Sequence, residues 1–287
     1  MSTYNRGIMS DVEARSFGGK FVLGLFFVIL VLTTLVVVFP FFFSFTAGLK
    51  SSTEIYKPGL NLWPAAPNWN NYLDAWKRFN MTRMFGNTII VAGGGVVLQL
   101  IVSSLTAYFL SRLKPIGSSV MMVLILITMT VPRIAYIVPL YITIAKLPIL
   151  NTSLINSYWG LWLPYAVNPF MILVLKTAFD SIPKEIYEAA QLDGASDSRM
   201  FFQFTIPLST SIMLVLGLLS FIGLWGDFLL PLLVLRDAEL QTASVRLFNL
   251  TRSFPMNLHM AGSFIAMLPP LLAAVFLQRY MKGGLTF

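Results

Sequence analysis

The chain has 287 residues, of which 56% are hydrophobic and only 11% are charged, and its mean hydropathy is +0.76. Charged residues make up about 25% of an ordinary soluble domain, so this composition excludes one and indicates a polytopic membrane protein. The net charge of +8 does not indicate a nucleic-acid partner, because the basic residues stand in short loops beside apolar stretches. We expect contact with membrane lipid and no binding of nucleic acid.

Cysteine is absent from the chain, and His259 is its one histidine. Disulfides and cysteine metal sites are therefore excluded, and a histidine metal cluster is nearly excluded. We interpret His259 as a polar residue at the end of a span, with a proton-binding or metal-binding role as the alternative. We predict no catalytic residue and no metal site in this chain.

Apolar stretches predict an all-α integral membrane protein with six spans, since a helix needs about 20 apolar residues to cross a bilayer. We place a cytosolic tail at 1–20, a six-span domain at 21–282 and a second cytosolic tail at 283–287. The first span lacks a signal-peptide cleavage site and is predicted to be retained. The spans are predicted at 21–43, 84–110, 118–145, 155–175, 206–235 and 258–278.

Two of these spans contain residues that interrupt a transmembrane helix. The third is broken by Pro132 and Pro139, with Arg133 between them, and a charge there must face protein or water rather than lipid. The fifth is interrupted at Gly226 and Asp227. We interpret Asp227 as an interfacial polar group, with a place in a transport path as the alternative.

The second span contains the run Gly93-Gly94-Gly95. Small residues allow helices to approach closely in lipid, so the run predicts a packing site. No Lys-Ser or Lys-Thr follows it, which excludes a phosphate-binding loop.

The fourth span combines aromatic and amide side chains with Pro164 and Pro169. Prolines free backbone carbonyls, which spans tolerate where neighbours or a watery cavity satisfy them. Aromatic faces suit the C–H surfaces of sugars and amides suit their hydroxyls, although packing and interfacial anchoring explain such residues equally well. With one residue each from the third and fifth spans, the candidate path residues are Thr130, Trp159, Trp162, Asn168 and Asp227.

Residues 183–204, here called the acidic segment, form a polar stretch between two apolar spans. The sequence predicts two short helices, with Pro183 at the first helical position, Gly194 in a left-handed turn and Ser196 capping the second helix. Four acids stand against two bases in this otherwise basic chain, so we expect either a docking surface for a cationic partner or an ordinary solvated loop. The acids are Glu185, Glu188, Asp193 and Asp197.

The spacing within the acidic segment resembles the signature of permease subunits of binding-protein-dependent ABC importers. Glu188-Ala189-Ala190 is followed after three residues by Gly194, and after nine more by Phe204-Thr205-Ile206-Pro207. The family pattern ends in Ile-x-Leu-Pro, and both apolar positions hold other apolar residues here. The residue sequence from Ile182 to Ser196, together with Pro139-Leu140-Tyr141, is most similar to the carbohydrate class. This class includes the second permease subunit of the maltose importer.

The resemblance implies that the acidic segment is a cytoplasmic coupling helix that binds an ATPase subunit. The residues it assigns to this contact are Glu188, Ala189, Ala190, Asp193, Gly194 and Pro207. It implies a location in the bacterial inner membrane and a heterodimer with a homologous permease. Two ATPase subunits and an external solute-binding protein would complete the assembly. The cargo would be a carbohydrate, most simply an oligosaccharide. The chain would hold no cofactor, while ATP-Mg would bind the ATPase subunits.

Orientation in the membrane rests on this resemblance, because basic residues divide evenly between the two sides. Ten of the 20 lysines and arginines fall in predicted inner segments and ten in outer ones. The outer loops are predicted at 48–83 and 236–257, and the resemblance directs the second toward the binding protein. Two alternatives are an ion-gradient-driven secondary transporter and a membrane-embedded transferase, which would need mid-membrane ionisable residues or clustered carboxylates.

Overall fold

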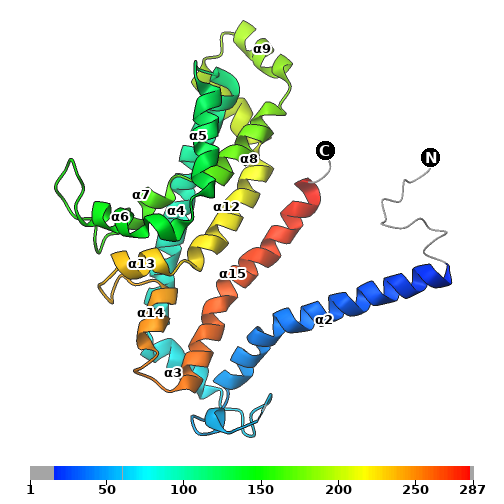
Figure 1. Cartoon of the computed structure of the whole chain (residues 1–287), viewed down its shortest axis with the longest axis vertical. Helices are drawn as coiled ribbons and strands as arrows, with labels where there is room; N and C mark the ends of the chain where they lie inside the picture. Colours follow the sequence, from blue (N-terminus) through cyan, green and yellow to red (C-terminus); the bar gives the residue numbers. More distant parts are fainter. Residues whose placement is uncertain (1–15, 60, 285–287) are drawn as a thin grey trace.

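The computed structural model describes residues 16–59 and 61–284, and every regular element within these ranges is a helix (Figure 1). Most of the predicted tails 1–20 and 283–287 lies outside the described residues. The first half of the chain forms α2 (Phe17–Gly48), η1 (Glu54–Tyr56), α3 (Asn70–Arg78), α4 (Met81–Tyr108), η2 (Phe109–Leu113), α5 (Ser118–Thr130) and α6 (Arg133–Ala145). The second half forms α7 (Trp159–Tyr165), α8 (Pro169–Asp180), α9 (Lys184–Leu192), α10 (Asp197–Met200), η3 (Phe201–Thr205), α11 (Ile206–Leu208), α12 (Thr210–Trp225), α13 (Leu229–Val234), α14 (Ala243–Leu250) and α15 (Met256–Gly284).

The number of predicted spans agrees with the helices that are long and apolar enough to cross a membrane. Within the described residues three single helices qualify, and three bent pairs raise the number to six if each pair is one span. The single helices are α2, α4 with η2, and α15. The fold is therefore that of an all-α integral membrane protein.

The bent pairs differ from the predicted spans in where they turn. The break expected at Pro132 separates α5 from α6 by 102°, whereas Pro139 lies inside α6 and does not interrupt it. Figure 1 shows α6 running across the direction of α5. A proline removes the backbone N–H that the next turn needs, but it does not fix the direction in which the chain continues.

The fourth and fifth predicted spans are also displaced along the chain. The fourth is the pair α7 and α8, bent by 47° and extending to Asp180, because Asn168 caps α8 and Pro169 begins it. The fifth is the pair of 197–208 and α12, bent by 75°, and α12 ends at the expected break at Gly226. After this break α13 turns away from the axis of α12 (Figure 1).

The predicted outer loops gather at one end of the molecule, and the acidic segment stands at the other. Figure 1 shows α3 and α14 at the end opposite α9. Asn71 joins the first outer loop to the end of α2, because its Nδ2 donates to the carbonyls of Gly48 and Lys50 at 2.9 Å each. Asn257 donates to the same Lys50 carbonyl at 3.1 Å, which joins the start of α15 to the end of α2 and the first outer loop.

Helix α4 lies at the centre and packs against α7, α8 and α12. The glycine run predicted to allow close packing serves this contact. A Cβ on Gly94 would lie 2.4 Å from the Trp162 ring, and one on Gly95 would lie 2.7 Å from Leu224, while Gly93 has open space. Two of the three glycines are therefore required by close approach.

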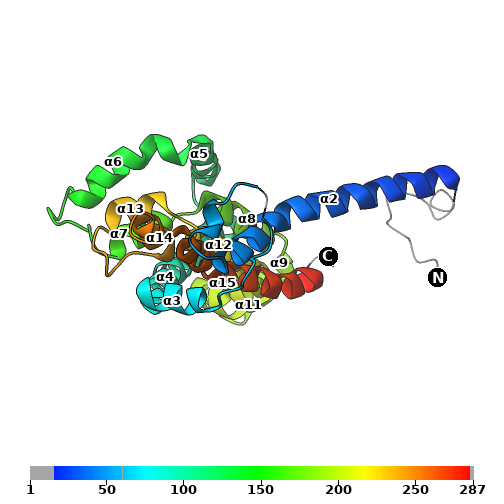
Figure 2. The ribbon, with the colours of Figure 1, turned by 90° about the horizontal axis from the view of Figure 1, so that it is seen from below.

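Helix α2 diverges from the other helices, as Figures 1 and 2 both show. Its apolar middle is exposed, and it packs on α15 only near its carboxyl end, where Ser44 Oγ donates to the Met260 carbonyl at 3.1 Å. His259, beside this contact, is buried with a ring nitrogen 2.7 Å from the Leu250 carbonyl oxygen. It lies near the first turn of α15, which agrees with its interpretation as a polar residue at a span end.

Candidate functional site

The acidic segment folds as two helices around a left-handed turn. Helix α9 begins at Lys184, so Pro183 precedes the helix and does not occupy its first position. Gly194 has a φ of +76°, its N–H donates to the Gln191 carbonyl at 3.0 Å, and the next N–H, that of Ala195, donates to Ala190 at 2.9 Å. This pair of bonds satisfies two carbonyls at the helix end and is the arrangement that favours glycine.

The second helix of the acidic segment begins as the sequence predicts. Ser196 Oγ accepts from the backbone N–H of Arg199 at 3.4 Å. The helix then widens into a single π-helical turn, η3, where Thr205 Oγ1 donates to the Met200 carbonyl at 3.2 Å. Such turns often mark functional positions, and this one carries the chain from the acidic segment into α12.

The inward face of the acidic segment is part of the protein core. Tyr187, Ala190, Met200 and Phe201 are buried in a cluster with the end of α8. The hydroxyl of Tyr187 lies 2.8 Å from Thr205 Oγ1, which joins α9 to η3. Both helices of the segment are therefore fixed to the spans beneath them.

Arg112, in the π-helical turn that ends α4, anchors the acidic segment. Its guanidinium donates to the carbonyl of Ile182 at 2.8 Å and also to that of Phe179, and it stacks on the Tyr187 ring at 4.0 Å. A planar guanidinium is suited to such combined donation and stacking. Sequence analysis placed this residue only in a tight turn, because nothing local indicates a partner about 70 residues further on.

The outward face of the acidic segment is exposed. Of the residues that the resemblance assigns to an ATPase contact, Ala190 is buried, whereas Glu188, Ala189, Asp193, Gly194 and Pro207 are all exposed. Within the described part of the chain, Glu185, Glu188 and Asp193 form no ion pair. Leu192 beside them is 89% exposed. The face thus combines unpaired negative charge with a bare apolar side chain.

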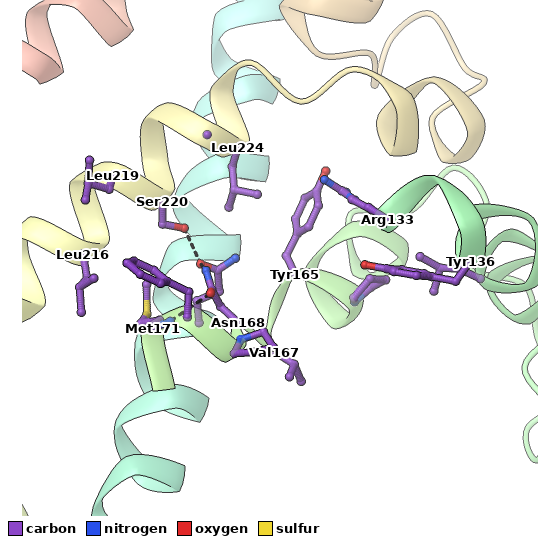
Figure 3. A pocket seen from close by; sticks show the side chains of 16 residues that line it. Arg133, Tyr136, Tyr165, Val167, Asn168, Met171, Leu216, Leu219, Ser220 and Leu224 are labelled. Atoms are coloured by element: carbon purple, nitrogen blue, oxygen red, sulfur yellow. Dashed lines mark hydrogen bonds between the residues drawn. The ribbon is translucent and has the colours of Figure 1, made fainter. Parts of the chain in front are cut away.

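A polar cavity of about 450 Å³ lies between the spans (Figure 3). We use the name polar cavity for the space bounded by α4, α6, α7, α8 and α12. Its polar and aromatic lining residues are Gln99, Arg133, Tyr136, Tyr165, Asn168, Phe170 and Ser220. Pro164 and Pro169, the two prolines that indicated a path lining, border it as well.

Gln99 organises one side of the polar cavity. Its Oε1 accepts from Asn168 Nδ2 at 3.3 Å and from the hydroxyl of Ser220, which brings α4, α8 and α12 together. Asn168 Oδ1 also accepts from the Met171 N–H at 3.1 Å, so the same amide caps α8. These amide and hydroxyl groups are neutral and suit hydrogen bonding to a polar ligand.

Arg133 and Tyr165 meet at another side of the polar cavity (Figure 3). Both donate to Oδ2 of Asp227, which lies just after α12, at 2.7 Å from the guanidinium and 2.6 Å from the phenol. The Asp227 carbonyl accepts from Ser244 Oγ of α14 at 2.8 Å. Asp227 therefore joins four helical elements, and the half-exposed Arg133 pairs with it at the edge of the cavity.

The candidate path residues occupy different environments. Asn168 lines the polar cavity, and Asp227 lies directly behind Arg133 and Tyr165. Trp162 packs on Gly94 and donates from Nε1 to the Val91 carbonyl at 3.2 Å, while Trp159 is 51% exposed. Thr130 is exposed and donates to Ile127 in its own helix. These last three residues lie outside the lining of the cavity.

Neither site has the composition of a metal centre. Among the described residues, no group of three or more His, Asp or Glu side chains is placed to hold an ion.

The structure is similar to that of a bacterial ABC transporter involved in the import of the acidic polysaccharide alginate. The TM-score is 0.77 over 94% of this chain and 99% of the transporter chain, at 22% identity. A second structure of the alginate transporter, in complex with a pentasaccharide-bound periplasmic protein, gives 0.64 over 92% and 95%. At 22% and 14% identity the likeness establishes the fold alone.

Sequence comparison gives the family. The model of the binding-protein-dependent transport system inner membrane component matches residues 95–285, a range that contains both the acidic segment and the polar cavity. The chain belongs to this family and is a multi-pass protein of the inner membrane.

Two relatives align with nearly the whole chain. The sn-glycerol-3-phosphate transport system permease protein UgpE of Pectobacterium atrosepticum is 31% identical over 90% of this chain and 94% of its own length. The arabinooligosaccharides transport system permease protein AraQ of Bacillus subtilis is 31% identical over 93% and 94%. The family that the spacing of the acidic segment indicated is thus confirmed.

Proposed function

We propose that the chain is one permease subunit of an ATP-driven importer of an oligosaccharide, and that it forms half of the translocation path. The observation that carries this proposal is a mechanical one. Arg112, just after α4, stacks on Tyr187 of the acidic segment, and the segment packs in one cluster with the end of α8. The polar cavity is bordered by Gln99 of the same α4 and by Asn168, which caps the same α8. A displacement of the acidic segment would therefore move residues of the cavity.

The energy for this displacement would come from outside the chain. No phosphate-binding loop is present in its sequence, so ATP-Mg would bind partner ATPase subunits. Glu188, exposed and unpaired among the described residues, would accept a charge-assisted hydrogen bond from an ATPase arginine. Closure of the ATPases would then rock the spans between inward-open and outward-open states.

The remaining partners follow from the same proposal. A homologous permease would supply the other half of the path. Two ATPase subunits would bind at the end of the molecule that carries the acidic segment, and a solute-binding protein would bind at the opposite end. The periplasmic protein bound to the related alginate transporter supports the last of these. The outer loops, which gather at the end opposite α9, are the surface on which such a protein would dock.

The cargo is proposed from the relatives and from the cavity together. AraQ is named for arabinooligosaccharides, and the structural relative imports a polysaccharide. A cavity of about 450 Å³ lined by amides, hydroxyls and aromatic rings lies within the usual range for small-molecule sites, about 300–1,000 Å³.

Reconstitution of the purified assembly into lipid vesicles tests this function. We expect uptake of an oligosaccharide that requires ATP, the ATPase subunits and the binding protein, and that survives collapse of ion gradients. Uptake that persists without ATP but stops with the gradient would instead support a secondary transporter. Product formation by this chain alone in detergent would support a transferase.

A further inference from the structure

The polar cavity is almost free of net charge, and this bears on the class of ligand that it takes. Of the sixteen residues that line it, all within the described part of the chain, Arg133 alone carries a formal charge. That charge is compensated by Asp227 at 2.7 Å. This inference rests on the proposed function, because it treats the cavity as part of the translocation path.

The compensation is built into the packing of the helices. The Asp227 side chain is 9% exposed, and its Oδ2 is held by two donors, the guanidinium of Arg133 and the hydroxyl of Tyr165. The guanidinium also lies 5.5 Å from the Tyr165 ring. Arg133, at 47% side-chain exposure, therefore faces the cavity with a carboxylate fixed behind it.

An anionic ligand would gain little in such a site. A phosphate or uronate brought to Arg133 would also approach the Asp227 carboxylate, and the repulsion would offset the attraction. It would in addition lose water without a new, uncompensated cation to replace it. The other polar groups, Gln99, Asn168 and Ser220, are neutral and suit sugar hydroxyls.

The apolar part of the lining fits the same class of ligand. Tyr136 and Phe170 present aromatic side chains, and prolines and leucines complete the wall. Aromatic faces contact the C–H surfaces of sugar rings, whereas a compact phosphorylated polyol offers few such surfaces. The cavity thus combines the contacts that an uncharged oligosaccharide needs.

We propose that this subunit's polar cavity takes uncharged oligosaccharides and discriminates against phosphorylated and uronate ligands, with the Arg133–Asp227 pair as the group that sets this selectivity. The chain would then differ in cargo from the relatives named for glycerol phosphate and for alginate, although it shares their fold.

The test uses the complete assembly in vesicles and two panels of substrates. The uncharged panel contains maltotriose, raffinose and an arabinotriose, and the anionic panel contains trigalacturonate and glycerol phosphate. We expect ATP-dependent uptake from the uncharged panel alone. Because a binding protein also selects cargo, inhibition by each anion is measured on the same assembly, with one uncharged substrate and one binding protein throughout.

Variants of the charged pair separate this proposal from a selectivity set elsewhere. Asp227→Asn leaves Arg133 without its carboxylate, and we expect trigalacturonate to inhibit uptake at about tenfold lower concentration, since a tenfold change corresponds to about 1.4 kcal/mol. The double variant Arg133→Gln/Asp227→Asn restores neutrality and should restore resistance to trigalacturonate. Tyr165→Phe keeps both charges and should not admit anions. Assembly of each variant is checked by co-purification, and Asp227→Ser, which removes the same carboxylate and keeps Arg133, takes the place of Asp227→Asn if that variant does not assemble.

Each result supports or overturns the proposal. ATP-dependent uptake of an anion by the unaltered assembly would overturn the selectivity and leave the importer function in place. Equal sensitivity of the single and double variants to trigalacturonate would overturn the role of the pair. Failure of every sugar and anion to enter with ATP would overturn the importer function itself.

Discussion

The acidic segment and the polar cavity differ in whether their carboxylates are exposed and unpaired or buried and paired. In the acidic segment, Glu185, Glu188 and Asp193 are exposed and have no ion-pair partner among the described residues. At the cavity, Asp227 is nearly buried and receives two donors at Oδ2. A buried charge must be paired within the chain, whereas an exposed one is free to pair with another protein. The carboxylates of the acidic segment are therefore available to a partner protein, whereas the charge of Asp227 is already paired within this subunit.

Both regions are connected through the same helices. Arg112 lies just after α4 and Phe179 near the end of α8. Gln99 lies earlier in the same α4, and Asn168 caps the start of the same α8. The comparison predicts that changes at the acidic segment alter coupling to ATP, and that changes at the cavity alter which ligand is carried.

Reversal of charge at Glu188 should have the largest effect. We expect Glu188→Lys to reduce ATP-dependent uptake about a hundredfold, because like charges at an interface cost several kcal/mol. Uptake and substrate-stimulated ATPase activity are measured on the reconstituted assembly. Glu185→Lys is the matched control, since it makes the same change on the same helix outside the family spacing. Equal losses in both variants, or unaltered ATPase stimulation in Glu188→Lys, would contradict a specific role for Glu188.

Loss of the Arg112 guanidinium should weaken the anchor of the acidic segment. Arg112→Met removes donation to two carbonyls and the stacking on Tyr187, and we expect the free energy of unfolding to fall by about 2–3 kcal/mol. Thermal unfolding in detergent and sugar transported per ATP are the measurements, and both should decrease. Lys114→Met removes a nearby exposed cation and should leave both nearly unchanged. A loss of stability without a loss of coupling would show that Arg112 does not link the two regions.

A methyl group at Gly94 should disturb the packing between α4 and α7. Gly94→Ala would bring a Cβ to 2.4 Å from Trp162 in the present geometry, and overpacking of this kind costs about 1–3 kcal/mol. Gly93→Ala has open space in this chain and, as the matched control, should be neutral or stabilising. Thermal unfolding of the two variants is compared. The same stability in both would mean that the Trp162 ring moves without cost.

Substitution at Gly194 should have the smallest effect. An alanine Cβ would meet no atom within 4 Å, so its cost comes only from the φ of +76°, about 1 kcal/mol. Hydrogen exchange at the Ala195 amide, which donates to Ala190, should accelerate about fivefold. Gly194→Asn should exchange more slowly than Gly194→Ala, because asparagine tolerates the left-handed region. Unchanged exchange in Gly194→Ala would place the strain elsewhere in the turn.

Local patterns predicted the parts of the structure that depend on local chemistry. Span number follows from apolar length, and the turn at Gly194 follows from the conformational freedom of glycine within a recognisable spacing. Pro132 and Gly226 correctly marked breaks, but the 102° turn between α5 and α6 depends on what each helix packs against. Pro183 was misplaced by one position, because the ends of helices are set by small differences between neighbouring residues.

The candidate site was harder to predict, because it is made of pairs that lie far apart in sequence. Arg133 and Asp227 are 94 residues apart. Sequence analysis identified each as a polar residue that interrupts an apolar span, but it did not identify the two as an ion pair. The Trp162 ring has the chemistry to contact the C–H face of a sugar, but in the structure it packs against Gly94. Sequence spacing alone does not reveal this contact. Gln99 was missed, because a single glutamine in an apolar span has no periodic or motif signal.

The sharp turn after α5 has a consequence for the surrounding bilayer. The span made by α5 and α6 extends only about 20 Å along α5, because that helix has 13 residues and α6 departs from its direction by 102°. A hydrocarbon core is about 30 Å thick, so we expect the bilayer to be thinner beside α5 than beside α4. Acyl-chain length thus becomes a variable to which the rate of uptake in vesicles should respond.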